Sequence, residues 1–175
     1  MEAIRLALLT AHYRDPLDWS NDRLRQARQT LDRFYRALTL PRDPVFERFG
    51  EADAAVRPVR EALEDDLNTP LALSHLHQIA GAINRSTSDA ERSALQRALE
   101  IGGGLMGLLG QPPLDWLQGS EKANADRIAE RIAARTAARR QRRFAEADHI
   151  RAELAGEGII LEDRPDGTTT WWRKD

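Results

Sequence analysis

The sequence contains no cysteine, which removes several kinds of chemistry at once. Disulfide bonds, thiolate zinc sites, iron–sulfur clusters and a cysteine nucleophile are all excluded. No apolar run reaches the roughly 18 residues that a membrane span needs, and no signal-peptide pattern opens the chain, so we expect no membrane partner. Lysine is scarce as well: Lys122 and Lys174 stand among 26 basic residues, so arginine carries nearly all of the positive charge.

The composition is that of a soluble helical protein with one ordinary domain or two small ones. The chain has 175 residues, of which 41% are hydrophobic and 31% charged, and its formal net charge is −2. The molecule as a whole is therefore not a polycation. A nucleic-acid partner would have to meet a local basic patch.

The first two thirds of the chain show amphipathic helical patterns. They cover about residues 2–13, 20–38 and 51–64, and two more begin near Pro70 and after Ser88. Ser20, Thr69 and Ser88 are predicted to cap the helices that follow them. Pro58 should kink or divide the third helix. The first pattern is apolar on more than one side, which is typical of a helix that packs on several neighbours.

The last third has a different composition. Residues 111–123 resemble a linker that Trp116 and Leu117 could hold in place. An arginine-rich helix is predicted at about residues 124–140, and a short helix at 145–155. Two strands follow, at residues 159–161 and 168–172, with a turn at residues 164–167. The fold class predicted is mainly α, with a small α+β module that ends in a β-hairpin.

Three apparent chemical motifs do not withstand inspection. Residues 102–107 match the dinucleotide pattern G-x-G-x-x-G, but a helix precedes them where a strand is needed, so a helix break or close helix packing is predicted. His75 and His77 are two residues apart on a helix and point to nearly opposite sides, which argues against a metal site. Asp65 and Asp66 are adjacent, and helix termination explains them better than paired acid–base catalysis.

A stripe of arginines survives this inspection. Arg127, Arg131, Arg135, Arg139 and Arg143 recur every four residues and fall near one helix face. The segment from residue 126 to residue 151 holds eight arginines against four acidic residues, while the rest of the chain is acidic. Such a basic region is consistent either with a solvated helix face or with a nucleic-acid footprint.

Aromatic residues in the same segment favour RNA over the solvated face. Phe144, Trp171 and Trp172 could stack on unpaired bases, as aromatic residues do in proteins that bind RNA loops. Arginine can bind phosphate oxygens in a forked geometry and can also stack on bases. The sequence therefore predicts an RNA-binding C-terminal end.

The tail also resembles the C-terminal end of bacterial cysteinyl-tRNA synthetases. The resemblance is carried by an Arg-rich helix, an aromatic residue, Ala147-Asp148, Ile150-Arg151, and then Gly158-Ile-Ile-Leu-Glu-Asp163-Arg-Pro-Asp-Gly-Thr-Thr169. It extends upstream to the DALR helical domain of that family, through Ala11-His-Tyr-Arg14, Asp65-Asp-Leu-Asn-Thr-Pro70 and Leu105-Met-Gly-Leu-Leu109. The resemblance covers essentially the whole chain in order.

The resemblance implies a DALR-type helical bundle at residues 1–120 and an anticodon-binding module at residues 121–175. It implies a cytoplasmic, non-catalytic part of a cysteine–tRNA ligase, whose partners are the tRNA for cysteine and the catalytic domain of the same enzyme. The HIGH and KMSKS signatures and the zinc-binding cysteines of that catalytic domain are absent from this sequence. We therefore expect no catalytic residue, no bound ATP and no zinc in this chain.

Eight residues are candidates for contact with the anticodon. They are Arg131, Arg135, Arg139, Phe144, Asp148, Arg151, Asp163 and Trp171. Phe144 could stack on a base, and Asp148 or Asp163 could accept hydrogen bonds from a base edge. Alternatively, Asp148 and Arg151 could pair with each other, and Asp163 could cap the turn near Gly167.

Two other functions remain open. One is part of a mycothiol-pathway cysteine ligase, although such enzymes lack the tail that runs here from Gly158 to Trp172. The other is a free-standing helical module that binds other RNA or protein partners. The register of the last strand also stays open by one residue. The family usually has two threonines and one tryptophan there, whereas this sequence has three threonines and two tryptophans.

Overall fold

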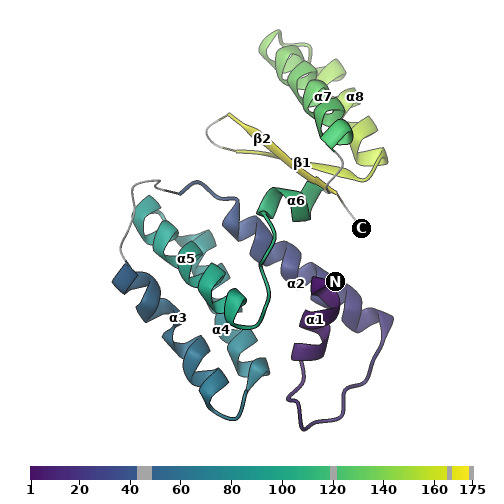
Figure 1. Cartoon of the computed structure of the whole chain (residues 1–175). Helices are drawn as coiled ribbons and strands as arrows, with labels where there is room; N and C mark the ends of the chain where they lie inside the picture. The colour runs from purple at the N-terminus through teal and green to yellow at the C-terminus, as the bar shows by residue number, and fades with distance from the viewer. Residues whose placement is uncertain (43–48, 119–121, 165–166, 174–175) are drawn as a thin grey trace. The chain divides into compact units, whose positions relative to one another are not determined.

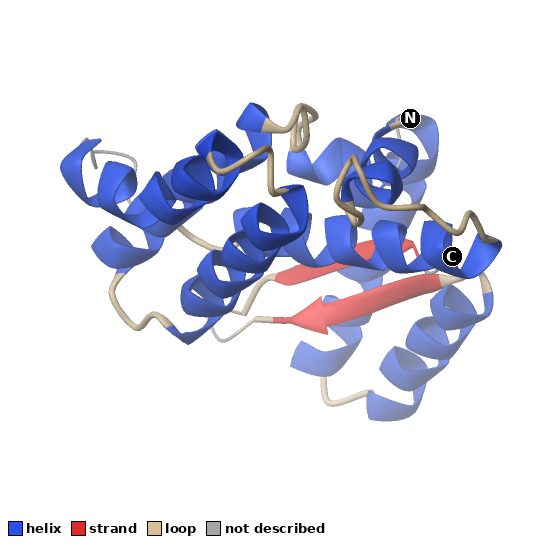
Figure 2. Cartoon of the chain, turned by 90° about the horizontal axis from the view of Figure 1, so that it is seen from below, coloured by secondary structure: helices blue, strands red, loops and turns tan. Residues whose placement is uncertain are grey.

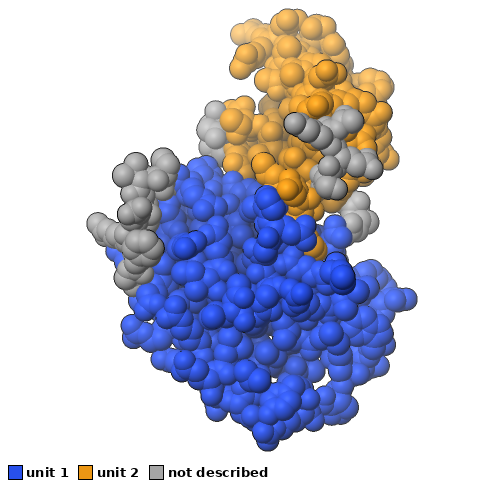
Figure 3. Space-filling model, viewed as in Figure 1, with its two compact units in different colours: residues 1–113 blue, residues 114–175 orange. Residues whose placement is uncertain are grey.

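The computed structural model describes residues 1–42, 49–118, 122–164 and 167–173. The chain divides into two compact units, Met1–Pro113 and Leu114–Asp175 (Figure 3). Within the described residues, eight helices precede a two-stranded antiparallel hairpin, drawn red in Figure 2. The prediction of a mainly α fold with a C-terminal β-hairpin is confirmed.

The first unit is a bundle of five helices (Figure 1). They are α1 (Glu2–Leu9), α2 (Asn21–Leu38), α3 (Phe49–Glu64), α4 (Thr69–Arg85) and α5 (Asp89–Leu105). Helices α3, α4 and α5 pack against one another, α1 packs on α2, and α2 also contacts α4 and α5. The apolar stripes predicted from the sequence supply the core, which includes Leu6, Leu31, Phe34, Val56, Leu76, Ile83 and Leu99.

Side-chain caps set three of these helix starts. The Ser20 hydroxyl accepts a hydrogen bond from the Arg23 amide at 3.2 Å, and the Ser88 hydroxyl accepts one from the Glu91 amide at 3.4 Å, both as predicted. The predicted cap at Thr69 is wrong by one residue. The Asn68 side chain accepts from the Leu71 amide at 3.1 Å, because an Asn side-chain oxygen reaches the free amides of the first turn from that position.

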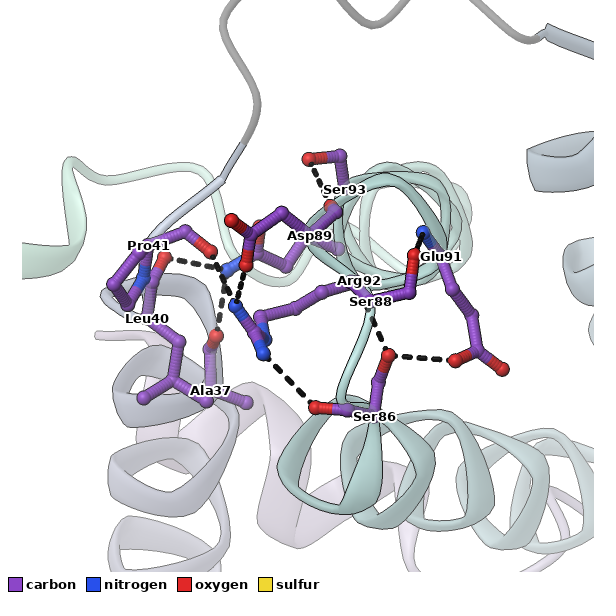
Figure 4. A network of polar contacts seen from close by, with 10 residues as sticks. Ala37, Leu40, Pro41, Ser86, Ser88, Asp89, Glu91, Arg92 and Ser93 are labelled. Carbon is purple, nitrogen blue, oxygen red and sulfur yellow. Dashed lines mark hydrogen bonds and ion pairs between the residues drawn. The ribbon is translucent and has the colours of Figure 1, made fainter.

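Arg92 joins the end of α2 to the turn between α4 and α5 (Figure 4). Its guanidinium donates to the carbonyls of Pro41 and Ser86 at 3.2 and 2.9 Å, and to the Asp89 carboxylate at 2.6 Å. The fully buried Gln96 amide makes a second link, since it donates to the carbonyls of Ala37 and Leu40 at 2.9 and 3.0 Å. These bonds satisfy carbonyls at a helix end that have no partner within the helix.

Two other predictions for this unit need correction. Helix α1 ends at Leu9 rather than near residue 13, because the Thr10 hydroxyl bonds the Ala7 carbonyl at 2.7 Å and the chain then turns away. Of the two effects predicted for Pro58, division of the helix does not occur: Pro58 lies inside α3, and the packing of α3 against α4 and α5 keeps the helix continuous. Tertiary contacts here outweigh a local helix breaker.

One of the three glycines at residues 102–104 serves helix packing. All three lie within α5, and a Cβ atom at Gly102 would come within 2.7 Å of the Leu76 side chain on α4. The close approach of α4 and α5 therefore explains why residue 102 is a glycine. This agrees with the prediction of close helix packing rather than a nucleotide-binding loop.

The second unit holds the short helix α6 (Pro113–Gln118) from Leu114 onward, then α7 (Lys122–Arg140), α8 (Phe144–Gly156), β1 (Ile159–Asp163) and β2 (Thr169–Arg173). Helix α6 forms where a linker was predicted, and Leu117 is buried. Helix α7 packs on α8, and α8 packs on β1. Ile128, Leu154, Ile159, Leu161 and Trp171 form the core of this unit.

The hairpin register is fixed by the pairs Asp163 with Thr169 and Leu161 with Trp171. Residues 165 and 166 of the predicted turn lie outside the described residues. On either side, the Arg164 amide donates to the Thr168 carbonyl at 2.8 Å, and Gly167 has a φ of +83°, which glycine adopts without strain. In the part of the chain that is described, no helix is long and apolar enough to span a membrane.

Candidate nucleic-acid interface

The candidate site is built on the helical hairpin of α7 and α8. Helix α7 ends in a Schellman turn, in which the Arg143 amide bonds the Ala138 carbonyl at 2.9 Å and the Arg142 amide bonds the Arg139 carbonyl at 3.0 Å. Arg142 takes the left-handed position with a φ of 59°. Helix α8 begins two residues later at Phe144, so the tip between the two helices is very short.

The predicted arginine stripe is largely paired with carboxylates inside the unit. Arg131 donates to Glu157 at 2.5 Å and to Glu153 at 2.8 Å, and Arg127 pairs with Glu157 at 3.2 Å. Hydrogen bonding to Arg131 lowers the pKa of the Glu157 carboxyl, and the same bond raises the pKa of Arg131. These contacts fasten α7 to the C-terminal end of α8.

Asp163 is another carboxylate that pairs with arginines of the stripe. Arg135, whose side chain is only 5% exposed, donates to both carboxylate oxygens of Asp163 at 2.8 and 2.7 Å. Arg139 and the Thr169 hydroxyl add bonds at 2.9 and 2.8 Å. The forked bond from Arg135, with help from Thr169 and Arg139, holds the pKa of the Asp163 carboxyl far below its usual value of 3.8.

These contacts change the interpretation of four candidates. Arg131, Arg135, Arg139 and Asp163 hold helices and hairpin together, and a guanidinium that already faces a carboxylate has less positive potential left for phosphate. Asp163 also does not cap its turn through the Gly167 amide, which bonds the Arg164 carbonyl at 3.0 Å. Its carboxylate orients arginines instead.

Three other candidates share an exposed stripe on α8. Phe144, Asp148 and Arg151 are spaced four and three residues apart, which places them along one side of the helix, and all three are exposed. Phe144 is 60% exposed although it is a large apolar residue. Asp148 and Arg151 form no ion pair with each other in the described structure, so the local pairing proposed as an alternative does not occur. The charge of Asp148 contributes, after Asp163, to the raised pKa of Arg135.

Two exposed arginines at the tip were not among the candidates. Arg140 ends α7 and Arg142 follows it, and within the described residues neither side chain makes a hydrogen bond or an ion pair. Arg143 differs, because its guanidinium pairs with Glu146. Sequence spacing could have found Arg140 and Arg142 as cations outside the stripe of arginines that recur every four residues. It could not show that carboxylates neutralise most of the stripe itself.

Trp171 takes no part in this surface. Its side chain is 7% exposed and packs in the core of the unit with Leu154 and Leu161. Its ring is therefore not available to stack on a base in this structure, and the burial accounts for the tryptophan as a core residue. In the described part of the chain, no group of three or more His, Cys, Asp or Glu residues could hold a metal ion.

The first comparison identifies a class of domain. Residues 58–110, which include the C-terminal part of α3 and all of α4 and α5, match the family described as the DALR domain. This match falls where the resemblance predicted a DALR bundle.

The particular relatives are cysteine–tRNA ligases. The chain is 48% identical to the cysteine–tRNA ligase of Paramagnetospirillum magneticum, over 99% of this chain and 38% of the relative. It is 48% identical to the enzyme of Rhodospirillum centenum, over 99% of this chain and 37% of the relative. It is 44% identical to the enzyme of Xanthomonas campestris pv. campestris, over 99% of this chain and 36% of the relative. The predicted relationship to cysteine–tRNA ligases is confirmed, and the chain spans somewhat more than a third of their length.

Proposed function

We propose that residues 114–175 bind the anticodon loop of a tRNA, specifically the tRNA for cysteine, as the non-catalytic part of a cysteine–tRNA ligase. The observation that carries this proposal is the exposed stripe of Phe144, Asp148 and Arg151 beside Arg140 and Arg142. The relationship to cysteine–tRNA ligases supplies the class of RNA.

The tip of the α7–α8 hairpin suits the phosphate backbone. Arg140, Arg142 and Arg151 carry positive charge that the described structure does not neutralise. No side chain caps the start of α8, so its first amide groups add positive potential at the same place. The paired arginines earlier in α7 instead hold this helix to the end of α8 and to β1, and a preformed helical hairpin loses less entropy on binding.

Phe144 and Asp148 suit the bases. An exposed phenyl ring at the first position of α8 offers a stacking platform for an unpaired loop base. Asp148 lies one helical turn further on, and a carboxylate there could accept a hydrogen bond from a base amino group. We assign base reading to Asp148 rather than Asp163, because Arg135, Arg139 and Thr169 already occupy the Asp163 oxygens.

The test compares two exposed aromatic residues in different units. Phe144 is 60% exposed and Tyr13, in the first unit, is 59% exposed. Binding of a cysteine tRNA transcript to Phe144→Ala should weaken by about 1–3 kcal/mol, the range for loss of one stacked base. Tyr13→Ala should bind as the wild type does. Equal effects of the two changes, or none, would contradict the assignment.

Base reading has its own test. Asp148→Asn should reduce the preference for a GCA anticodon over an otherwise identical tRNA with a changed anticodon by about 1–3 kcal/mol. Overall affinity should hold or rise, since a negative charge near phosphate is removed. Glu146→Gln serves as the matched control, because Glu146 is already paired with Arg143. An unchanged preference in Asp148→Asn would remove its proposed role.

Catalysis is proposed to belong to the remainder of the enzyme. The sequence lacks both ATP-binding signatures and zinc-binding cysteines, so we expect no ATP or zinc to bind here. Cysteine-dependent pyrophosphate exchange by the isolated chain should not exceed a buffer control. Measurable exchange would contradict this assignment and leave the RNA-binding proposal standing.

A further inference from the structure

A buried carboxylate holds the segment with which the helical bundle ends. Glu2, in the first turn of α1, is 6% exposed, and its carboxylate accepts hydrogen bonds from the amides of Leu109 and Gly110. The Tyr35 hydroxyl donates to the same carboxylate at 2.7 Å. That hydroxyl in turn accepts a bond from the Gln111 amide at 3.3 Å. We call these contacts the Glu2 latch.

The polar groups of the Glu2 latch satisfy one another in the closed state. Burial, and after it the bond to Glu2, raises the pKa of the Tyr35 hydroxyl, which therefore stays protonated and can donate. The carboxylate lies where the dipole of α1 favours a negative charge. When the latch opens, water can hydrogen-bond to each freed group, so the closed state has only a modest advantage over the open one. The contacts therefore suit a reversible closure.

The closed state also holds part of the backbone in an unfavourable conformation. Leu109 has a φ of 61°, in the left-handed region that leucine rarely adopts. Its side chain lies over Gly103, where a Cβ atom would come within 2.7 Å of it. Arg5 secures the start of the same segment by donating to the Gly107 carbonyl. Opening would release the strain at Leu109, which brings the open and closed states closer in free energy.

The Glu2 latch determines how much of the connection to the second unit is held by the bundle. Leu108 is 1% exposed and belongs to the bundle core, whereas α6, which leads into the second unit, begins at Pro113. With the latch closed, the Gln111 amide is bonded, and Pro112, whose ring fixes its φ, is the residue between it and α6. With the latch open, the amides of residues 109–111 lose these bonds.

Helix α6 is attached to the second unit at its other end. Leu117 is buried, and the Gln118 side chain donates to the Trp171 carbonyl at 3.3 Å. Because α6 is anchored to the hairpin in this way, freedom between the two units has to come from the segment before α6.

We infer that the Glu2 latch is a conformational device that sets the range of motion between the bundle and the second unit. Closed, it confines this motion to the torsions around Pro112. Open, it adds a segment that contains Gly110. A tight connection raises the effective concentration of one unit near any partner that the other unit holds. The inference follows from contacts inside the first unit and does not require RNA binding.

The test measures the spread of distances between two spin labels by pulsed electron paramagnetic resonance. Because the sequence has no cysteine, labels can be attached to Gln78→Cys in α4 and Ala152→Cys in α8, at two exposed positions. Tyr35→Phe keeps the ring in the core but removes the hydroxyl that joins Glu2 to Gln111. In this variant the distance distribution should broaden by roughly 5–10 Å, the span of about three additional free residues.

Two further variants separate the Glu2 latch from a general loss of stability. Gln96→Leu is the matched control, because it also removes a fully buried polar side chain, whose partners are the carbonyls of Ala37 and Leu40 rather than the 107–111 segment. It should leave the distance distribution as in the wild type. Glu2→Gln keeps the side-chain length but cannot accept hydrogen bonds at both terminal atoms. It should broaden the distribution and speed exchange of the Leu109 amide about tenfold.

Three outcomes decide the inference. A broadening that the Gln96→Leu control shares would indicate general loosening and overturn it. Faster amide exchange in Glu2→Gln with an unchanged distance distribution would also overturn it, because the latch would then be a purely structural contact. Broadening confined to Tyr35→Phe and Glu2→Gln supports it.

A binding measurement keeps this inference apart from the proposed function. A cysteine anticodon stem–loop should bind equally to the wild type, Tyr35→Phe and Glu2→Gln, since the tip between α7 and α8 is unaltered. Absence of binding in all three proteins would contradict the proposed RNA site, while the distance distributions would still decide the role of the Glu2 latch.

Discussion

Removing the Asp163 carboxylate should loosen the C-terminal unit although no apolar core residue is changed. Asp163→Ala leaves the Arg135 guanidinium, with its side chain 5% exposed, without the two hydrogen bonds that now neutralise it. It also releases Arg139 and the Thr169 hydroxyl, which ties β2 to the end of β1. A buried charge without a partner destabilises the folded state far more than a lost surface pair does.

The magnitude follows from the burial of the two partners. Loss of one member of a fully buried pair costs about 3–5 kcal/mol, whereas an exposed pair contributes about 1 kcal/mol or less. The Asp163 side chain is 37% exposed, so solvent screens part of the interaction. We therefore expect the free energy of unfolding to fall by about 2–3 kcal/mol for Asp163→Ala at neutral pH. Arg139→Ala, which removes a guanidinium that is 51% exposed, should cost about 0.5 kcal/mol.

A double variant separates the pair energy from the effect of an orphaned charge. Arg135→Met with Asp163→Ala removes both charges and keeps an apolar side chain in the buried position. Its stability should exceed that of Asp163→Ala by about 1–2 kcal/mol, because the guanidinium no longer lies buried without a partner.

Two measurements check this reasoning. Urea unfolding followed by circular dichroism gives the change in free energy, and amide hydrogen exchange of Leu161 and Trp171 locates it in the hairpin. Faster exchange confined to the second unit is expected. The reasoning is refuted if Asp163→Ala unfolds like Arg139→Ala, or if the double variant is no more stable than Asp163→Ala.

Three shorter predictions concern other features. The pKa of Asp163 is lower in the folded than in the unfolded protein, so its ionised carboxylate stabilises the fold fully above its unfolded pKa of about 4 and loses this effect as the pH falls toward the folded pKa. The free energy of unfolding should therefore depend less on pH below pH 4 in Asp163→Asn than in the wild type. Arg142→Gly should raise stability by about 0.5–1 kcal/mol in thermal melts, since glycine suits the left-handed position, and should weaken tRNA binding through the lost charge. Gly102→Ala should lower stability by about 1–3 kcal/mol in urea, because its methyl group would clash with Leu76 on α4.

Much of the fold could be predicted because the local signals agreed with the packing. Helical spacing and the caps at Ser20 and Ser88 marked α2 and α5, and the strands at the end paired as expected. The errors had two different causes. Pro58 does not divide α3, which packs against α4 and α5, and α1 ends early because the Thr10 hydroxyl bonds the Ala7 carbonyl although the apolar pattern runs on.

The candidate site was less accessible to sequence reasoning. Spacing showed that Arg131 and Arg135 share a helix face, but their partners come from the end of α8 and from β1, at least 22 residues away. The alternation of side chains in a strand likewise could not decide whether Trp171 or Trp172 faces the core. A shift of the strand register by one residue exchanges the two faces, and the sequence left the register of this strand uncertain by one residue. Which arginines are structural and which are exposed therefore depends on ion pairs with residues distant in the sequence.

The most direct test of RNA binding at the hairpin tip is a chemical-shift titration of the isotopically labelled chain with a cysteine anticodon stem–loop. The largest amide shifts should fall between residues 140 and 151, with Phe144 among them, and should weaken with added salt by a log–log slope of about −0.7 per phosphate contacted. Amides of the first unit should hardly move. Shifts centred on the first unit, or no saturable shift with the GCA loop at low salt, would contradict the account.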